Sequence, residues 1–327
     1  MNQVKNKYLN VSLSARTFAS YNTGVNTFVH FCMLYGMKFC TAEWVGIEEI
    51  LIHFVCYLAD SKQLTHATIK SYLAGLRNYC ITHNLDFPFE KRNGQPMLQL
   101  KLVLRGIKKS RVPKQLKRLP VTPDIMSKLF KTLDGKRFGV YNDSLMRAVI
   151  SIAYFGLLRC GEFTTHNNQF DPEINLCYGD VSIDGNEAKL ILKGSKTDPF
   201  RFGVTIPFYK QESMLCPVTA LHRFMRQRSK FAMDPRLPLF LFEDFTHLTR
   251  KTFLYMLQST CESSGVNAAG YHGHSFRIGG ATICAAMGVE DHLIQSLGRW
   301  SSNCYKTYVH VSTSSIKDAQ RKMSGMK

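Results

Sequence analysis

Residues 181–208, VSIDGNEAKLILKGSKTDPFRFGVTIPF, carry the only strand signals that stand out along the sequence. Two short runs, 181–183 and 188–193, flank Asp184-Gly185, a dipeptide typical of a tight hairpin turn. A third run, 202–208, follows a polar connection. The region therefore predicts a small three-stranded antiparallel sheet within a protein that is otherwise helical.

The sequence on both sides of this sheet predicts helices. Before it, apolar residues recur every three or four positions over 18–32, 50–58, 68–81 and 98–107. Closer to it, Thr122-Pro123 places a capping residue before a proline, and a long apolar helix is expected over 142–158. We therefore expect a mainly α protein of two domains. These are a four-helix bundle at 1–110, a basic linker at 111–121, and an α+β domain of helices and the small sheet at 122–327.

Charge gives the first indication of function. The chain has 42 Lys and Arg residues against 24 Asp and Glu, a formal net charge of +18. An excess of this size suits a polyanion such as double-stranded DNA. A generic basic protein that binds ribosomes or acidic partners remains the alternative on charge alone.

Other classes of protein lack their expected patterns. The longest apolar stretches, such as 148–158, are too short to span a membrane, and residues 1–10 have no apolar signal-peptide core. Ten cysteines occur singly, with no C-x-x-C pair for a metal knuckle or a redox motif. We expect a soluble protein with no membrane contact, no metal and no cofactor.

A basic segment precedes the second domain. Residues 101–120 hold eight Lys and Arg residues and no acid, with two prolines. A DNA-contacting hinge is the favoured interpretation, and a solvated tail or a nuclear import signal are the alternatives. The candidate DNA-binding residues are Arg105, Lys108, Lys109, Arg111, Lys114, Lys117 and Arg118.

Two candidate site residues, Arg159 and Lys196, come after the long apolar helix in the sequence. In 156–162, GLLRCGE, Arg159 comes directly after that helix, where a buried guanidinium needs an anion or a carboxylate. Glu162, three residues on, could simply be its ion-pair partner. Lys196 lies in SKTD, between the second and third strands. A hairpin lysine is commonly just solvated, but at this tip it could also donate a proton.

Two further motifs follow near the C-terminus. In 274–282, HSFRIGGAT, His274 and Arg277 share the first turn of an expected helix, which favours a phosphate. Residues 297–310, LGRWSSNCYKTYVH, contain Trp300, Tyr305 and Tyr308. Taken singly, these residues could be a surface His and Arg and ordinary core or interface aromatics.

Together, the motifs resemble the tyrosine recombinase family, which includes phage integrases and Xer-type and Cre-type recombinases. The ordered set runs from Arg159 to Tyr308, about half of the chain, and the helical first half resembles that family's core-binding domain. The wording of SKTD, HSFRIGGAT and LGRWSSNCYKTY is most similar to recombinases of eukaryotic Ngaro and DIRS-type retroelements. The resemblance implies a mobile-element enzyme that recombines or integrates DNA in the nucleus.

The resemblance also implies roles in binding the substrate phosphate. Arg159 and Arg277 would hold the nonbridging oxygens of a phosphodiester with planar forks, and His274 would add a donor. Trp300, which replaces a histidine of many relatives, would donate from its indole N–H. Glu162 would orient Arg159 without touching the substrate.

The same resemblance assigns the chemical steps. Tyr308 would attack phosphorus and form a 3′-phosphotyrosyl link, while Lys196 would protonate the leaving 5′ oxygen. Trp300 lies eight residues before Tyr308, whereas in relatives the equivalent position commonly lies nine residues before the nucleophile. Tyr305 therefore stays open as the nucleophile, with Tyr308 preferred because Tyr308-Val309-His310 resembles the residues that follow it in relatives.

Assembly and rival functions complete these expectations. Relatives act as tetramers on two DNA sites, and Ile316, Ala319 and Met323 line one face of a short helix expected at 315–323. That face could dock on a neighbouring subunit or pack on its own domain. The rivals are a type IB topoisomerase, a catalytically idle DNA-binding protein derived from a mobile element, and a metal nuclease. No acidic cluster with nuclease spacing supports the last of these.

Overall fold

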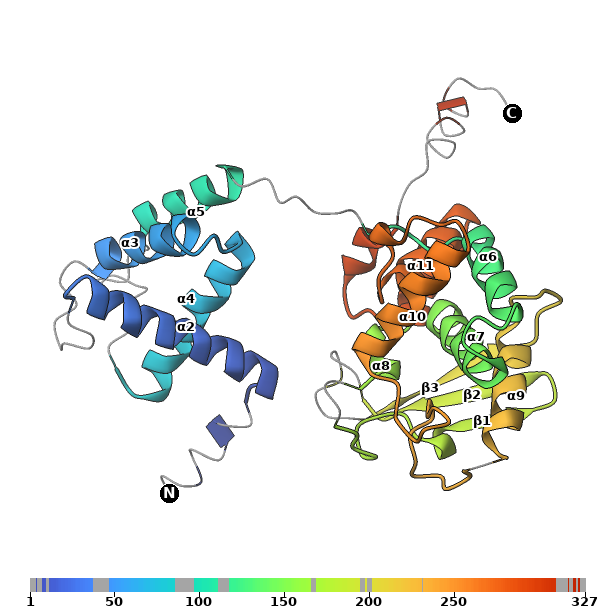
Figure 1. Ribbon diagram of the computed structural model, residues 1–327. Coiled ribbons are helices and arrows are strands. Elements are labelled where there is room, and N and C mark those ends of the chain that lie inside the picture. The colour runs from blue at the N-terminus through green and yellow to red at the C-terminus, as the bar shows by residue number, and fades with distance from the viewer. Residues whose placement is uncertain are drawn as a thin grey trace. The chain divides into compact units, whose positions relative to one another are not determined.

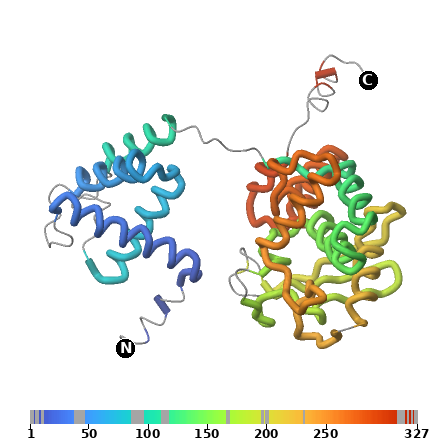
Figure 2. The backbone as a smooth tube through the Cα atoms, viewed as in Figure 1, coloured from blue at the N-terminus to red at the C-terminus, as the bar shows by residue number. Residues whose placement is uncertain are grey.

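The structure of the protein is a computed structural model. It describes residues 12–37, 47–85, 97–110, 118–165, 169–194, 202–230 and 232–309, with a few single residues outside these ranges. The chain divides into two compact units, Met1–Lys114 and Gln115–Lys327. Figure 1 labels the elements of each unit, and Figure 2 follows its backbone.

The described part of the first unit is helical. Its helices are α2 (Ala15–Leu34), α3 (Ile47–Asp60), α4 (His66–Thr82) and α5 (Leu98–Ser110). Ser14 and Thr65 cap α2 and α4, since each side-chain oxygen accepts a hydrogen bond from the backbone N–H three residues on. The carboxylate of Glu48, at the start of α3, accepts from the N–H groups of Gln99 and Leu100 and so caps α5.

Two glycines let α2 and α4 approach closely. A Cβ on Gly24 would lie 2.7 Å from Cα of Tyr72, and a Cβ on Gly75 would lie 2.7 Å from the carbonyl oxygen of Tyr21. Any larger residue would therefore push the helices apart. Beneath this contact, Phe28, Phe31 and Phe54 form the aromatic centre of the unit's core.

The second unit begins with α6 (Pro123–Asp134), which Thr122 caps through its hydroxyl as the sequence predicts. The buried helix α7 (Val140–Phe155) follows, and a tight turn leads to the short helix α8 (Cys160–Phe163). Beyond the sheet come α9 (Pro217–Arg228), α10 (Arg250–Ser263), α11 (Ser275–Ala286) and α12 (Asp291–Gly298), then the 3-10 helix η3 (Asn303–Thr307). Helix α11 contacts α7, and α10 contacts α6. In Figure 2 these orange and green segments lie side by side.

The sheet has the topology that the hairpin signals predict. Strands β1 (Val181–Asp184), β2 (Glu187–Leu192) and β3 (Val204–Tyr209) pair antiparallel in the order β1-β2-β3. Ala188, Leu190 and Leu192 of β2 alternate with more exposed residues and point into the core. The mainly α, two-unit arrangement with one small three-stranded sheet confirms the expected fold class.

The expected linker differs from the structure at its C-terminal end. Residues 118–121 pack on the second unit, where the N–H of Leu119 donates to Gly270 and the N–H of Val121 donates to Ser275. Val121 is fully buried, and its carbonyl lies so close to Gly279 that a Cβ there would clash. This backbone pairing explains why residues 118–121, which the sequence predicts as part of a linker, belong to the second unit.

Several expected residues lie outside the described part of the chain. They are Lys196, Arg111, Lys114 and Lys117, together with most of the expected tail helix at 315–323. Among the helices that the structure describes, none is long and apolar enough to cross a membrane.

Candidate active site

One carboxylate organises the site. Glu162, on α8, accepts a hydrogen bond from Nη1 of Arg159 at 2.9 Å and from the backbone N–H of the same residue at 2.8 Å. Its other partner is Nη2 of Arg299, 3.0 Å away, at the C-terminal end of α12. The side chain of Glu162 is 5% exposed. The local i,i+3 pairing is therefore present, and a second arginine from far along the chain joins it.

Arg277 lies deeper than its neighbours and is fully buried. Its Nη1 donates to the carbonyl of Leu157 and its Nη2 to that of Gly298, 2.6 Å away. Burial, and then the charge of Arg159, lower the pKa of Arg277 to about 10. The two Nη groups of Arg277, which were expected to face the phosphate oxygens, thus donate to backbone carbonyls in this structure.

His274 occupies the N-cap position of α11, three residues before Arg277, and its side chain makes no capping hydrogen bond. Its burial and then the charges of Arg118, Arg250, Arg277 and Arg159 lower the pKa of the imidazole to about 4. The ring is therefore neutral at physiological pH and can donate from only one of its nitrogens.

Trp300 lies over the guanidinium of Arg277, with 4.0 Å between the guanidinium carbon and the ring centroid. A Cβ on Gly298 would fall within 2 Å of the indole, so only glycine leaves room for the ring here. The structure therefore shows Trp300 as a cation–π partner of Arg277. Its expected indole hydrogen bond to the substrate stays a prediction.

The two candidate tyrosines have different surroundings. Tyr308 is partly buried, with its ring 5.4 Å from that of Trp300 and 5.7 Å from the guanidinium carbon of Arg277. Tyr305 is buried, and its hydroxyl bonds to Asp291, which raises the pKa of that phenol to about 12. Tyr308 thus lies beside Arg277, whereas the hydroxyl of Tyr305 is engaged by a carboxylate.

The hairpin that carries Lys196 is anchored on both sides of its tip. Lys193 forms an ion pair with Asp180 at 2.8 Å, and its Nζ also lies 3.0 Å from Sγ of Cys177. On the other side, the carboxylate of Asp198 accepts from the N–H groups of Phe202 and Gly203. The base of the hairpin is thus fixed, while Lys196 itself lies outside the described residues.

The expected DNA-contacting residues fall in both units. Arg105, Lys108 and Lys109 are exposed on α5, in the first unit. Arg118 is exposed in the second unit, and its charge acts on His274. Arg118 thus lies near enough to His274 for its charge to help lower the pKa of that imidazole.

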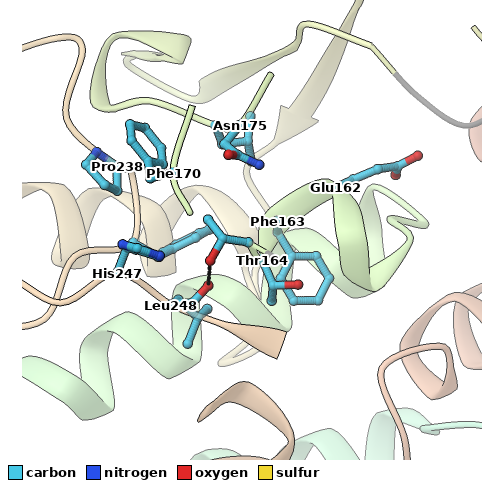
Figure 3. Close-up of a pocket in the computed structure, with 11 residues that line it drawn as sticks. Glu162, Phe163, Thr164, Phe170, Asn175, Pro238, His247 and Leu248 are labelled. Carbon is cyan, nitrogen blue, oxygen red and sulfur yellow. Dashed lines mark hydrogen bonds between the residues drawn. The ribbon is translucent and has the colours of Figure 1, made fainter. Parts of the chain in front are cut away.

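A small cavity lies behind Glu162, as Figure 3 shows. It measures about 20 Å³ and is lined mainly by apolar side chains such as Phe163, Phe170 and Leu248. The carboxylate of Glu162 points away from these residues. The cavity has room for about one water molecule and is too small for a nucleotide.

Sequence reasoning did not single out Arg299. The signal was the spacing: Arg299 lies nine residues before Tyr308, and Trp300 only eight. The residue nine positions before Tyr308 is therefore the arginine bound to Glu162.

Comparison with known proteins shows the fold. No protein-family model matches the sequence, and no curated protein matches it. Among solved structures, the XerH site-specific recombinase bound to difH substrate aligns with a TM-score of 0.54 and 18% identity, over 84% of this chain and 70% of that chain. The integrase of the Tn1549 transposon, in complex with transposon right end DNA, aligns with a TM-score of 0.52 and 14% identity, over 85% of each chain.

A lambda integrase dimer bound to a COC′ core site is also similar, with a TM-score of 0.50 and 13% identity over 93% of this chain and 75% of that chain. The chain thus has the fold of tyrosine recombinases and integrases.

Proposed function

We propose that this protein is a site-specific DNA recombinase or integrase that cuts and rejoins DNA through a 3′-phosphotyrosyl intermediate on Tyr308. One observation carries the proposal. Arg159 precedes α8, His274 and Arg277 begin α11, and Tyr308 follows η3, yet the charges of Arg159 and Arg277 act on His274 and the ring of Tyr308 lies 5.7 Å from Arg277, on a recombinase fold. Three guanidinium groups surround the single charge of Glu162, so the site is net positive and suits a phosphate.

The chemistry follows from these groups. The phenolic oxygen of Tyr308 gives its proton to solvent and forms a bond to phosphorus as the bond from phosphorus to the 5′ oxygen breaks. Lys196 gives a proton to that leaving oxygen. Arg159, neutral His274 and the buried charge of Arg277 stabilise the negative charge that develops on the nonbridging oxygens. Because the phosphotyrosyl link keeps the energy of the broken bond, attack by a second 5′ hydroxyl rejoins the strand without ATP.

The substrate and setting are part of the same proposal. The solved neighbours include complexes of recombinases and integrases with DNA, and the net charge of +18 suits double-stranded DNA as the partner. We propose an origin in a mobile element of the Ngaro or DIRS type, action in the nucleus, and assembly as a tetramer on two DNA sites. Deleting the residues after Val311 should weaken pairing of two DNA sites and spare binding to a single site.

Covalent capture tests the proposed function. The protein is incubated in EDTA with nicked duplexes of candidate element ends, and protein–DNA adducts are resolved under denaturing conditions. Wild-type protein and Tyr305→Phe should form an adduct, whereas Tyr308→Phe should bind DNA and form none. An adduct lost only in Tyr305→Phe would move the nucleophile to Tyr305.

The same assay separates the rivals. Adducts that persist in both tyrosine variants, or cleavage that requires Mg²⁺, would overturn the proposed mechanism. DNA binding without any adduct on every candidate end would indicate an idle DNA-binding protein. Relaxation of supercoiled DNA without joining of two different duplexes would indicate a type IB topoisomerase.

A further inference from the structure

Arg299 is a partly buried arginine to which the proposed chemistry gives no step. It follows α12 with a left-handed backbone, φ 55°, and its side chain is 13% exposed. Burial is the main cause that lowers its pKa, and Glu162 opposes the shift. A guanidinium in such a place is costly unless its N–H groups are well matched.

The hydrogen bonds of Arg299 account for nearly all of its donors. Nη1 donates to the carbonyl of Gly156 at 2.8 Å and to that of Leu297 at 3.2 Å. Nη2 donates to the carbonyl of Leu157 at 3.3 Å and to Oε2 of Glu162 at 3.0 Å. The remaining donor, Nε, is buried without a partner among the described residues. The two Nη groups of Arg299 are therefore fully engaged within the protein, and its Nε–H is buried.

These contacts join two segments that both carry site residues. Gly156 and Leu157 form the turn that leads into Arg159, while Leu297 and Gly298 lead into Trp300. Arg277 spans the same two segments, because it donates to Leu157 and to Gly298. Arg299 adds what Arg277 lacks, a direct ion pair with the carboxylate that holds Arg159.

The two oxygens of Glu162 show how Arg299 reaches Arg159. Oε1 accepts from Nη1 of Arg159, and Oε2 accepts both from the backbone N–H of Arg159 and from Arg299. Without Arg299, rotation of the carboxylate would be opposed only by groups of Arg159 itself. With it, the carboxylate plane is fixed from α12, and the guanidinium of Arg159 is fixed in turn.

We propose that Arg299 is a positioning residue of the cleavage site: it holds Glu162, and through Glu162 it sets the orientation in which Arg159 meets the scissile phosphate. The inference rests on the proposed function for its catalytic consequence. Its structural part, the dependence of Arg159 on Arg299, stands without it.

The catalytic consequence is measured in single-turnover adduct formation at saturating DNA. Arg299→Met keeps most of the side-chain length and removes the charge, so it should slow adduct formation about 10- to 100-fold, with DNA affinity changed less than about twofold. Arg299→Lys should recover part of the rate, because an ammonium can still reach the carboxylate. In a Glu162→Gln background, Arg299→Met should cost less than about threefold, since the two changes break one connection.

Arg236 provides a matched control. It also pairs with a carboxylate at 2.9 Å, that of Glu173, but the pair is exposed and away from the site residues. Arg236→Met should therefore leave the rate of adduct formation unchanged. Effects of Arg299→Met and Glu162→Gln that simply add would overturn the inference.

A second readout does not depend on activity. In full-length protein labelled with ¹⁵N-arginine, the Nε–H signal of Arg159 is identified by its loss in Arg159→Lys. It should be sharp in wild type and in Arg236→Met, and should broaden or vanish in Arg299→Met. An unchanged Arg159 signal in Arg299→Met would contradict the inference. If wild type forms no adduct while the Arg159 signal still depends on Arg299, the proposed function fails and the positioning role holds.

Discussion

The basic residues of α5 and the arginines around Glu162 carry the same charge in opposite environments. Arg105, Lys108 and Lys109 are exposed on α5. Arg277 and Arg299, by contrast, are fully and partly buried, respectively, and donate to backbone carbonyls from distant parts of the chain. The exposed charges are screened by salt and need no fixed geometry, whereas the buried ones depend on each hydrogen bond.

This difference separates two contributions to DNA handling. Exposed lysines and arginines bind phosphates through counterion release, which is insensitive to small displacements. Buried arginines hold a geometry, so a change there affects folding and chemistry before it affects binding. Substitutions on α5 should therefore show their effect in DNA binding, and substitutions of the buried arginines should show theirs in folding and adduct formation.

The largest expected effect is that of Arg277→Ala. The substitution leaves the carbonyls of Leu157 and Gly298 without their donor and removes the group beneath Trp300. We expect the free energy of unfolding to fall by about 3–5 kcal/mol, together with loss of adduct formation. Urea unfolding measures the first effect, with Arg105→Ala as a control that should stay within about 0.5 kcal/mol of wild type. Equal urea midpoints for Arg277→Ala and Arg105→Ala would contradict the proposed difference between the two regions.

A smaller effect on folding is expected from Trp300→Phe. A phenyl ring keeps an aromatic face near Arg277 but leaves space over Gly298, where the indole packs tightly. The free energy of unfolding should fall by about 1–2 kcal/mol through the cavity and the weaker cation–π contact. Thermal unfolding followed by circular dichroism checks the value. An unchanged melting temperature would show that the indole contributes little to the cluster.

Neutralising Lys108, Lys109 and Arg111 should have no effect on folding and a clear one on binding. Replacement by glutamine should lower affinity for all duplexes alike and flatten the plot of log K against log salt by up to about three units of slope. Fluorescence anisotropy over a range of salt concentrations measures the slope. Arg299→Met should leave it unchanged, and a loss confined to one DNA sequence would show that this segment reads bases.

A pH dependence of stability is also expected from His274. Its pKa is about 4 in the folded protein, below the ordinary value of 6.5 that applies to the unfolded chain. Its contribution to stability is therefore fully present above pH 6.5 and is lost as the pH falls from 6.5 toward 4. Urea unfolding between pH 4.5 and 7.5 should show a shallower loss in His274→Gln than in wild type. Parallel pH profiles would contradict the burial of a neutral imidazole.

Local patterns predicted the local structure well. The Asp184-Gly185 turn and its flanking apolar runs became β1 and β2, and Thr122 caps α6 through its hydroxyl. The sequence around Leu119 and Val121 read as linker, because nothing local shows that their N–H groups pair with Gly270 and Ser275. That pairing joins residues more than 150 positions apart.

The sequence by itself determined the elements, their order and the residue types of the site, because helix periodicity, turn residues and caps depend on near neighbours. Only the tertiary structure decided how those residues are used. It bound Tyr305 to Asp291, occupied the fork of Arg277 with Leu157 and Gly298, and brought Arg299 to Glu162. Arg277 and Leu157 are 120 positions apart, and Arg299 and Glu162 are 137 apart. Hydrogen-bond partners so distant leave no periodic trace in the sequence, since they are fixed by the packing of whole helices.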